Sequence, residues 1–129
     1  MAHLLRESSL SSEGIPEFLE HFRVVLDGED LVGMVGIEPY GSDGLLRSLA
    51  VATPQRSRGI GTLLLRSAID DARRLGIRRF VLLTTTAADY FRKHGFRIID
   101  RASVTGGLTS SSQFRGACPD TATCMELQL

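Results

Sequence analysis

Six short segments of the chain carry either alternating apolar and polar residues or a continuous apolar run, and both patterns are typical of β-strands. Turn residues separate the first three segments, at Asp27-Gly28 and at Tyr40–Gly44, so we expect these strands to follow one another as a meander. The six predicted strands are Phe22–Leu26, Asp30–Ile37, Leu45–Val51, Arg79–Thr84, Phe96–Val104 and Thr123–Leu129.

Two helices interrupt the strands. Residues 62–75 place Leu65, Ala68, Ile69, Ala72 and Leu75 at helical spacing, and Gly76 is a natural end. A shorter helix is predicted over Ala87–His94, while residues 1–20 and 105–120 are expected to be largely irregular. A meander combined with strand–helix–strand crossovers predicts an α/β (α+β) fold with a mixed sheet.

Arg47 is a charged residue inside the otherwise apolar third strand. Alternation predicts that Arg47 shares a face with Leu45, Leu49 and Val51, while Ser48 points the other way. An arginine in such a strand must reach solvent or meet an anion. Arg47 is therefore a candidate to bind a substrate carboxylate, and a solvated sheet face is the alternative.

Composition and charge narrow the functional class. The 129 residues fit one domain, 1–129, and the 15 basic and 15 acidic residues cancel, which argues against nucleic acid or an anionic membrane as a partner. Without a membrane-length apolar run or a signal-peptide core, the expected location is the cytoplasm. Cys118 and Cys124 are expected to be free thiols, with a disulfide between them as the alternative, and no metal site is predicted.

The segment VATPQRSRGIGT, from Val51 to Thr62, is the most informative part of the sequence. Gly59 and Gly61 allow close approach of a ligand, and the first amides of the helix are unpaired donors that favour an anion. Arg56 and Arg58 add positive charge. The P-loop pattern is missing, and Leu64 replaces the third glycine of a dinucleotide fingerprint. A different phosphate-bearing ligand is predicted; a simple glycine-rich turn is the alternative.

Three motifs in this order resemble those of the GNAT acetyltransferases. Arg56–Gly61 (RSRGIG) looks like [QR]-x-x-G-x-[GA], Leu49–Val51 with Pro54 matches LAV-x-P, and Ala87–Phe96 (AADYFRKHGF) is similar to the helix A…Y-x-x-x-G-F. The resemblance implies one GNAT domain with a splayed sheet of about six strands and acetyl-CoA as cosubstrate. Its implied cofactor-binding residues are Leu49, Ala50, Val51, Arg56, Ser57, Arg58, Gly59, Ile60, Gly61, Thr62 and Phe91.

Candidate catalytic residues depart from the family pattern. Phe91 stands where the family's tyrosine is usual, so the neighbouring Tyr90, about 100° around the helix, is the candidate acid, with simple packing as the alternative. Leu45 stands where many members have a glutamate. Glu38 is the nearest candidate base, and an exposed turn residue is the alternative.

Further hydrogen-bonding residues are expected near the substrate. Ser48 and the cluster Thr84, Thr85 and Thr86 are the candidates, although threonines at a strand end also serve as strand and cap residues.

A narrower resemblance concerns the substrate. LLRSLAV, LLTTTAADYFRKHGF and QFRGACPDTATCMEL are similar to the small acetyltransferases of arsenic-resistance operons (ArsN-like) and to the acetyltransferase domain of N-acetylglutamate synthases. This likeness implies acetyl transfer to the amine of a small amino-acid-like molecule, glutamate-like or an arsenical analogue. A non-catalytic acyl-CoA sensor and a protein or peptide N-acetyltransferase are the alternatives, and a homodimer is compatible with the sequence.

Overall fold

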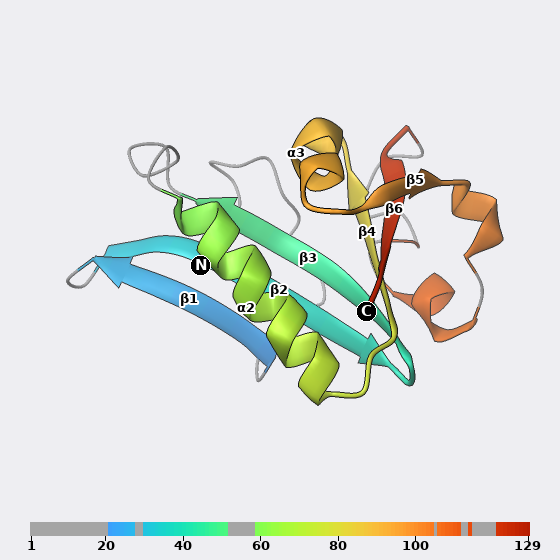
Figure 1. Ribbon diagram of the computed structural model, residues 1–129, viewed down its shortest axis with the longest axis horizontal. Coiled ribbons are helices and arrows are strands. Elements are labelled where there is room, and N and C mark those ends of the chain that lie inside the picture. The colour runs from blue at the N-terminus through green and yellow to red at the C-terminus, as the bar shows by residue number, and fades with distance from the viewer. Residues whose placement is uncertain (1–20, 28–29, 52–58, 105, 112–113, 115–120) are drawn as a thin grey trace.

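The computed structural model describes residues 21–27, 30–51, 59–104, 106–111, 114 and 121–129. Six strands form one sheet in the order β1-β2-β3-β4-β6-β5 (Figure 1). The strands are β1 (Phe22–Asp27), β2 (Asp30–Tyr40), β3 (Asp43–Val51), β4 (Arg79–Thr84), β5 (Arg97–Ile99) and β6 (Thr123–Gln128). The predicted mixed sheet of about six strands is confirmed.

The sheet is parallel at one place only among the described strands, between β3 and β4. Their pairing is short: Asp43, Gly44 and Leu45 lie opposite Arg79, Phe80 and Val81, and no pair follows in the described residues. Both strands continue beyond this point, β3 to Val51 and β4 to Thr84. The sheet therefore opens into two halves, as the predicted splay requires.

Two helices cover the same face of the sheet. Helix α2 (Ile60–Arg74) crosses β1, β2 and β3, and the short α3 (Ala88–Lys93) lies near β4 and β5 (Figure 1). The apolar side of α2, including Leu65, Ala68 and Ala72, packs with Phe80 and Phe91 in one cluster. The predicted spacing is confirmed except at Leu75, which is exposed where the helix ends.

The opposite face is covered by the chain that follows β5. A 3₁₀ helix at Arg101–Ser103 (η3) and another at Gly106–Ser110 (η4) lead back under the sheet. Leu108 and Val104 pack there against Leu45 and Val81. The predicted strand Phe96–Val104 is thus too long, because the Asp100 carboxylate accepts the Ala102 N–H and starts η3 instead.

Candidate active site

A bulge in β3 decides the geometry of the site. Met34 pairs with Ala50 but Gly36 pairs with Arg47, so three residues of β3 span what two residues of β2 span. Ser48 lies within the extra length and has φ +60°, a left-handed conformation that non-glycine residues seldom adopt.

The bulge reverses the side-chain alternation that the sequence predicts. Leu46 packs with the α2 cluster, and so do Leu49 and Val51, whereas Leu45 belongs to the cluster on the opposite face. Arg47 contacts Glu38, whose neighbour Ile37 faces α2, so Arg47 also lies on the opposite face. The predicted common face for Arg47, Leu49 and Val51 is therefore wrong, because one extra residue shifts a period-two pattern.

The end of β3 lies beside the beginning of α2. Leu49, Val51 and Ile60 pack on the same cluster. Gly33 leaves room for α2, because a Cβ on Gly33 would lie 3.0 Å from both Ile60 Cγ2 and Leu64 Cδ1. This contact brings the backbone of Leu49, Ala50 and Val51 next to the first turn of the helix.

The first turn of α2 presents backbone donors. Gly59 precedes the helix at φ +77° and its carbonyl accepts the Leu63 N–H at 3.1 Å. The amides of Ile60, Gly61 and Thr62 stand ahead of that first bond, and they carry the positive end of the helix dipole. Arg56, Ser57 and Arg58 lie outside the described residues, so their predicted part in an anion site stays a prediction.

Tyr90 and Phe91 turn in different directions. The Tyr90 hydroxyl lies 3.2 Å from Thr62 Oγ1, so Tyr90 faces the first turn of α2. The Phe91 ring is buried and meets Phe96 edge-on, with ring centroids 5.5 Å apart. Phe91 is therefore a core residue in this structure, while Tyr90 is the aromatic residue beside the predicted cofactor site.

The three threonines at the end of β4 lie in different surroundings. Thr84 Oγ1 accepts the Ala87 N–H at 3.0 Å and thereby orders the turn into α3. Thr85 and Thr86 are exposed. Thr84 fits the capping alternative, and a substrate contact for Thr85 or Thr86 stays a prediction.

Glu38 and Arg47 form a buried ion pair. Arg47 Nη1 donates to Glu38 Oε2 at 2.7 Å, and each side chain is 1% exposed. Tyr40 Oη donates to Glu38 Oε1 at 2.5 Å, and Arg47 Nε donates to Ser48 Oγ at 3.1 Å. The exposed-turn alternative for Glu38 and the solvated-face alternative for Arg47 are both wrong, because each residue meets the other inside the protein.

The alternation of residues predicts neither the role of Tyr40 nor the contact between Tyr90 and Thr62. The sequence predicts a turn at Tyr40, whereas β2 extends to Tyr40. Because side chains two residues apart share a strand face, a longer β2 would have placed Tyr40 beside Glu38. The contact to Thr62 spans 28 residues and has no local signal.

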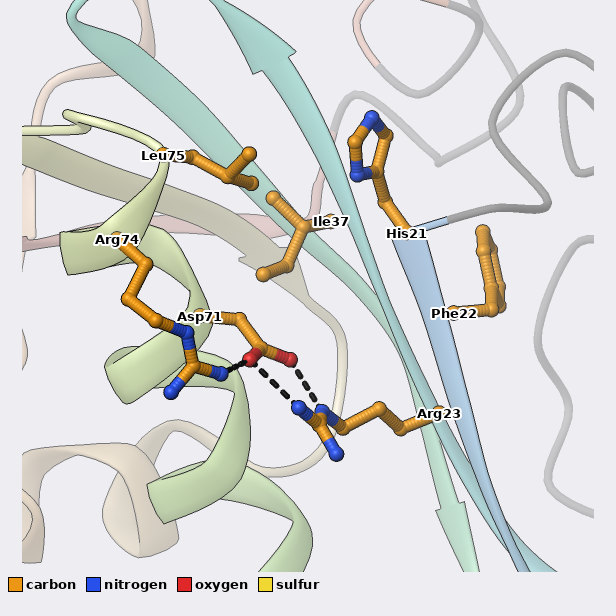
Figure 2. A pocket seen from close by; sticks show the side chains of 7 residues that line it. All are labelled: His21, Phe22, Arg23, Ile37, Asp71, Arg74 and Leu75. Atoms are coloured by element: carbon orange, nitrogen blue, oxygen red, sulfur yellow. Dashed lines mark hydrogen bonds and ion pairs between the residues drawn. The ribbon is translucent and has the colours of Figure 1, made fainter.

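A second arginine–carboxylate group lies on the face that α2 covers. A pocket of about 370 Å³ at the C-terminal end of α2 contains Asp71, which binds both Arg23 and Arg74 (Figure 2). The pocket is at the opposite end of α2 from Gly59, so it is not continuous with the predicted cofactor site. Its lining residues are His21, Phe22, Arg23, Ile37, Asp71, Arg74 and Leu75.

Other candidate chemistry is limited in the described part of the chain. Those residues contain no group of three or more His, Cys, Asp or Glu side chains that could hold a metal ion. Among them, no helix combines the length and apolarity needed to span a membrane. Cys124 is a buried free thiol, and its pKa is raised to about 11, chiefly by burial. Cys118 lies outside the described residues.

The opened sheet, the bulge and the glycine-led helix can be compared with known proteins. The model of the acetyltransferase (GNAT) family matches residues 5–96. This chain belongs to the GNAT family. The predicted family is thereby confirmed, while the likeness to ArsN-like proteins stays a prediction. No curated protein matches the sequence significantly.

Solved structures share this GNAT fold. N-acetylglutamate synthase from Neisseria gonorrhoeae, complexed with coenzyme A and N-acetyl-glutamate, superposes with a TM-score of 0.82 at 23% identity, over 99% of this chain and 32% of that chain. This chain therefore spans about a third of the length of that synthase.

Two shorter relatives match over most of their length. The IAA acetyltransferase from Bacillus cereus gives a TM-score of 0.68 at 18% identity, with 99% of this chain and 91% of that chain covered. A GNAT family acetyltransferase from Elizabethkingia anophelis with acetyl-CoA bound gives 0.68 at 20% identity, with coverage of 98% and 88%. At these identities the likeness establishes the fold.

Proposed function

We propose that this protein transfers the acetyl group of acetyl-CoA to the amine of a small, amino-acid-like molecule. The observation that carries the proposal is the opening between β3 and β4, which begins after Leu45 and Val81 and has the first turn of α2 beside it. Such an opening exposes strand backbone to an extended ligand, while the helix amides suit a pyrophosphate. Acetyl-CoA has both parts.

The two motifs bind different parts of the cofactor. The amides of Gly59, Ile60, Gly61 and Thr62 bind the pyrophosphate, together with Arg56, Ser57 and Arg58. The backbone of Leu49, Ala50 and Val51 pairs with the pantetheine arm and polarises the thioester carbonyl. The relatives from Neisseria and Elizabethkingia carry coenzyme A or acetyl-CoA, which supports this assignment.

The amine then attacks the polarised carbonyl carbon, and the C–S bond to CoA breaks. An ammonium substrate first loses one proton to become a neutral amine, and the nitrogen loses a second proton as the amide forms; a base accepts these protons directly or through water. Both carboxylate oxygens of Glu38 are engaged by Tyr40 and Arg47, so Glu38 is better placed to support β3 than to accept either proton directly. The leaving thiolate is stable enough to depart without an acid. Tyr90, whose hydroxyl faces Thr62 in the first turn of α2, is the candidate acid beside the proposed cofactor site.

The substrate class rests on the narrower resemblance and on the synthase from Neisseria, which binds N-acetyl-glutamate. A thiol-release assay with acetyl-CoA and a panel of amino acids, including glutamate and arsenical analogues, tests it. Turnover with an amino acid supports the proposal. Tight acetyl-CoA binding without thiol release from any amine would indicate the sensor alternative, and release with peptides alone would indicate a protein acetyltransferase.

Gly61→Leu tests the cofactor site directly. A Cβ at Gly61 would already lie 3.5 Å from Tyr90 Oη and 3.7 Å from Val51 Cγ2, so the rest of a leucine must displace Tyr90 or cover the helix amides. We expect acetyl-CoA affinity to fall by about 100-fold or more, which is roughly 2.7 kcal/mol. Arg66→Leu, on the exposed side of α2, is the matched control. Calorimetry measures binding, and circular dichroism checks that both variants fold.

Tyr90→Phe tests the acid. If the phenol only contacts Thr62, turnover stays within a few fold of the wild-type rate. A fall of roughly 100-fold, the low end of general acid catalysis, would identify Tyr90 as the acid. The rate of single-turnover thiol release separates this effect from slow product release.

A further inference from the structure

We propose that the buried Glu38–Arg47 pair is a positioning device that holds the bulge of β3 and thereby sets the backbone of Leu49–Val51 against the thioester. The inference rests on the proposed function, since it concerns the same acetyl-CoA site. It gives Arg47 a different role from the substrate carboxylate contact that the sequence predicts.

The contacts of Arg47 connect two strands with the bulge itself. One guanidinium nitrogen, Nη1, binds Glu38 on β2 at 2.7 Å, and another, Nε, binds the hydroxyl of Ser48 at 3.1 Å. Tyr40 donates to the second oxygen of Glu38 at 2.5 Å. The carboxylate is thus fixed from two sides, and the guanidinium is fixed by the carboxylate. Ser48 is the residue that this chain of contacts finally orients.

The bulge needs such support because its backbone is both unusual and poorly paired. Ser48 holds φ +60°, which costs free energy in a non-glycine residue and persists only where surroundings enforce it. Pairing with β4 ends at Leu45, three residues earlier, and pairing with β2 is interrupted between Arg47 and Ala50. At this break in the strand register, the side-chain contacts of Arg47 to Glu38 and Ser48 hold the two strands together.

Burial indicates what the pair does. Both side chains are 1% exposed, and a buried ion pair is seldom more stabilising than apolar residues of the same volume. Fixing one geometry is the best-supported use of such a pair. Here the geometry is a one-residue shift that turns Leu49 and Val51 toward α2 and away from the side of Arg47. Without the bulge, every residue after Ser48 would be turned over, so a different set of backbone N–H and C=O groups would face the opening.

The test uses acetyl-CoA and CoA as probes, so it needs no known amine. Arg47→Lys keeps the charge near Glu38 but cannot donate to Glu38 and Ser48 at once from a planar fork. Arg79→Lys is the matched control. Arg79 on β4 binds Asp43 on β3 through an Nε–Oδ1 contact of 3.1 Å, and this pair lies on the same face of the sheet but is partly exposed. Calorimetry gives both affinities, and the ¹³C chemical shift of bound [1-¹³C]acetyl-CoA reports carbonyl polarisation.

We expect wild-type protein to bind acetyl-CoA and to shift its carbonyl signal downfield. Arg47→Lys should lose most of that shift and bind acetyl-CoA about tenfold more weakly, whereas Arg79→Lys should match wild type within twofold. If Arg47→Lys does not fold, Ser48→Ala serves instead. It removes only the contact between Arg47 Nε and Ser48 Oγ, and it should also reduce the downfield shift of the carbonyl signal.

Two results would overturn the inference, and they are distinguishable from each other. A folded Arg47→Lys with unchanged affinity and carbonyl shift shows that the pair does not position the strand. A raised amine KM in that variant would then assign Arg47 to the substrate. If wild-type protein binds neither acetyl-CoA nor CoA, the proposed function itself fails, and with it the premise of the inference.

Discussion

Glu38 and Asp71 are two carboxylates in the same chain that each accept hydrogen bonds from two side chains, and in both cases arginine is a donor. They lie on opposite faces of the sheet. Glu38 is 1% exposed, and Arg47 is equally buried. Asp71 is 20% exposed, and its partners Arg23 and Arg74 are 50% and 65% exposed. The same chemistry thus operates in two different dielectric surroundings.

The difference in exposure separates a structural requirement from a surface contact. Removing charges from water is costly, and the cost is recovered only while both partners remain in place. An exposed pair loses little when it breaks, because water solvates each partner again. Comparing equivalent substitutions at the two carboxylates therefore measures burial and not merely the presence of an ion pair.

The largest difference is expected between Arg47→Ala and Arg23→Ala. Arg47→Ala leaves the Glu38 carboxylate buried with Tyr40 as its remaining described partner, which should cost about 3–5 kcal/mol of unfolding free energy. Arg23→Ala leaves Asp71 bound to Arg74 and open to water, so its cost should be about 1 kcal/mol or less. Urea unfolding followed by circular dichroism measures both values.

A paired substitution is the control for the first value. Glu38→Leu combined with Arg47→Met removes both charges and keeps apolar volume, so it should recover most of the lost stability. It should not recover the carbonyl polarisation of bound acetyl-CoA. Equal costs for the two arginine variants would contradict the comparison, since exposure would then make no difference.

The sequence predicts most of the fold, for reasons visible in particular elements. Helix α2 is identified by its 3.6-residue spacing and by Gly76, and its observed start at Ile60 is two residues earlier than the predicted start. The glycines at 59 and 61, with arginines just before them, predict an anion-binding turn at the start of this helix, and a simple glycine-rich turn is the alternative. These features are local, so a single sequence shows them.

The catalytic side of the site is less predictable because it depends on one non-local irregularity. Nothing in LLRSLAV distinguishes a bulge from a regular strand, since serine adopts φ near +60° only when its neighbours enforce it. The error at Ser48 then carries over to the facing of Leu49 and Val51. The contact between Glu38 and Arg47 depends on strand register, which alternation alone does not fix.

Cys124 lies on the same face of the sheet as Glu38, and ionisation of its thiol should change the unfolding free energy by an intermediate amount. Burial raises the pKa of its thiol from 9.0 to about 11, so the folded state holds this proton more tightly than the unfolded state does. The resulting stability is fully present below pH 9 and is lost as pH rises toward 11. The unfolding free energy should therefore decrease more between pH 8 and pH 10 for the wild type than for Cys124→Ala.

The control for this prediction is the variant's own behaviour at neutral pH. Cys124→Ala is expected to be less stable than wild type at pH 7, because it leaves a small cavity among Leu45, Val81 and Leu108. Only the dependence on pH isolates the thiol, since other groups titrate equally in both proteins. Parallel pH profiles for the two proteins would show that the thiol ionises alike in both states.

The smallest effect is expected at Asp71, and salt makes it measurable. Asp71→Asn keeps the side-chain shape but removes the charge that Arg23 and Arg74 share, which should cost about 0.2–1 kcal/mol. Because the three side chains meet water, this cost should shrink between 0.05 and 1 M NaCl, where the screening length falls to roughly 3 Å.

Glu38→Gln is the matched substitution on the buried face. Its cost should be larger and nearly independent of salt, because ions do not reach a side chain that is 1% exposed. If salt reduced both costs by the same amount, water and ions would have access to Glu38, and the contrast between the two faces would be wrong.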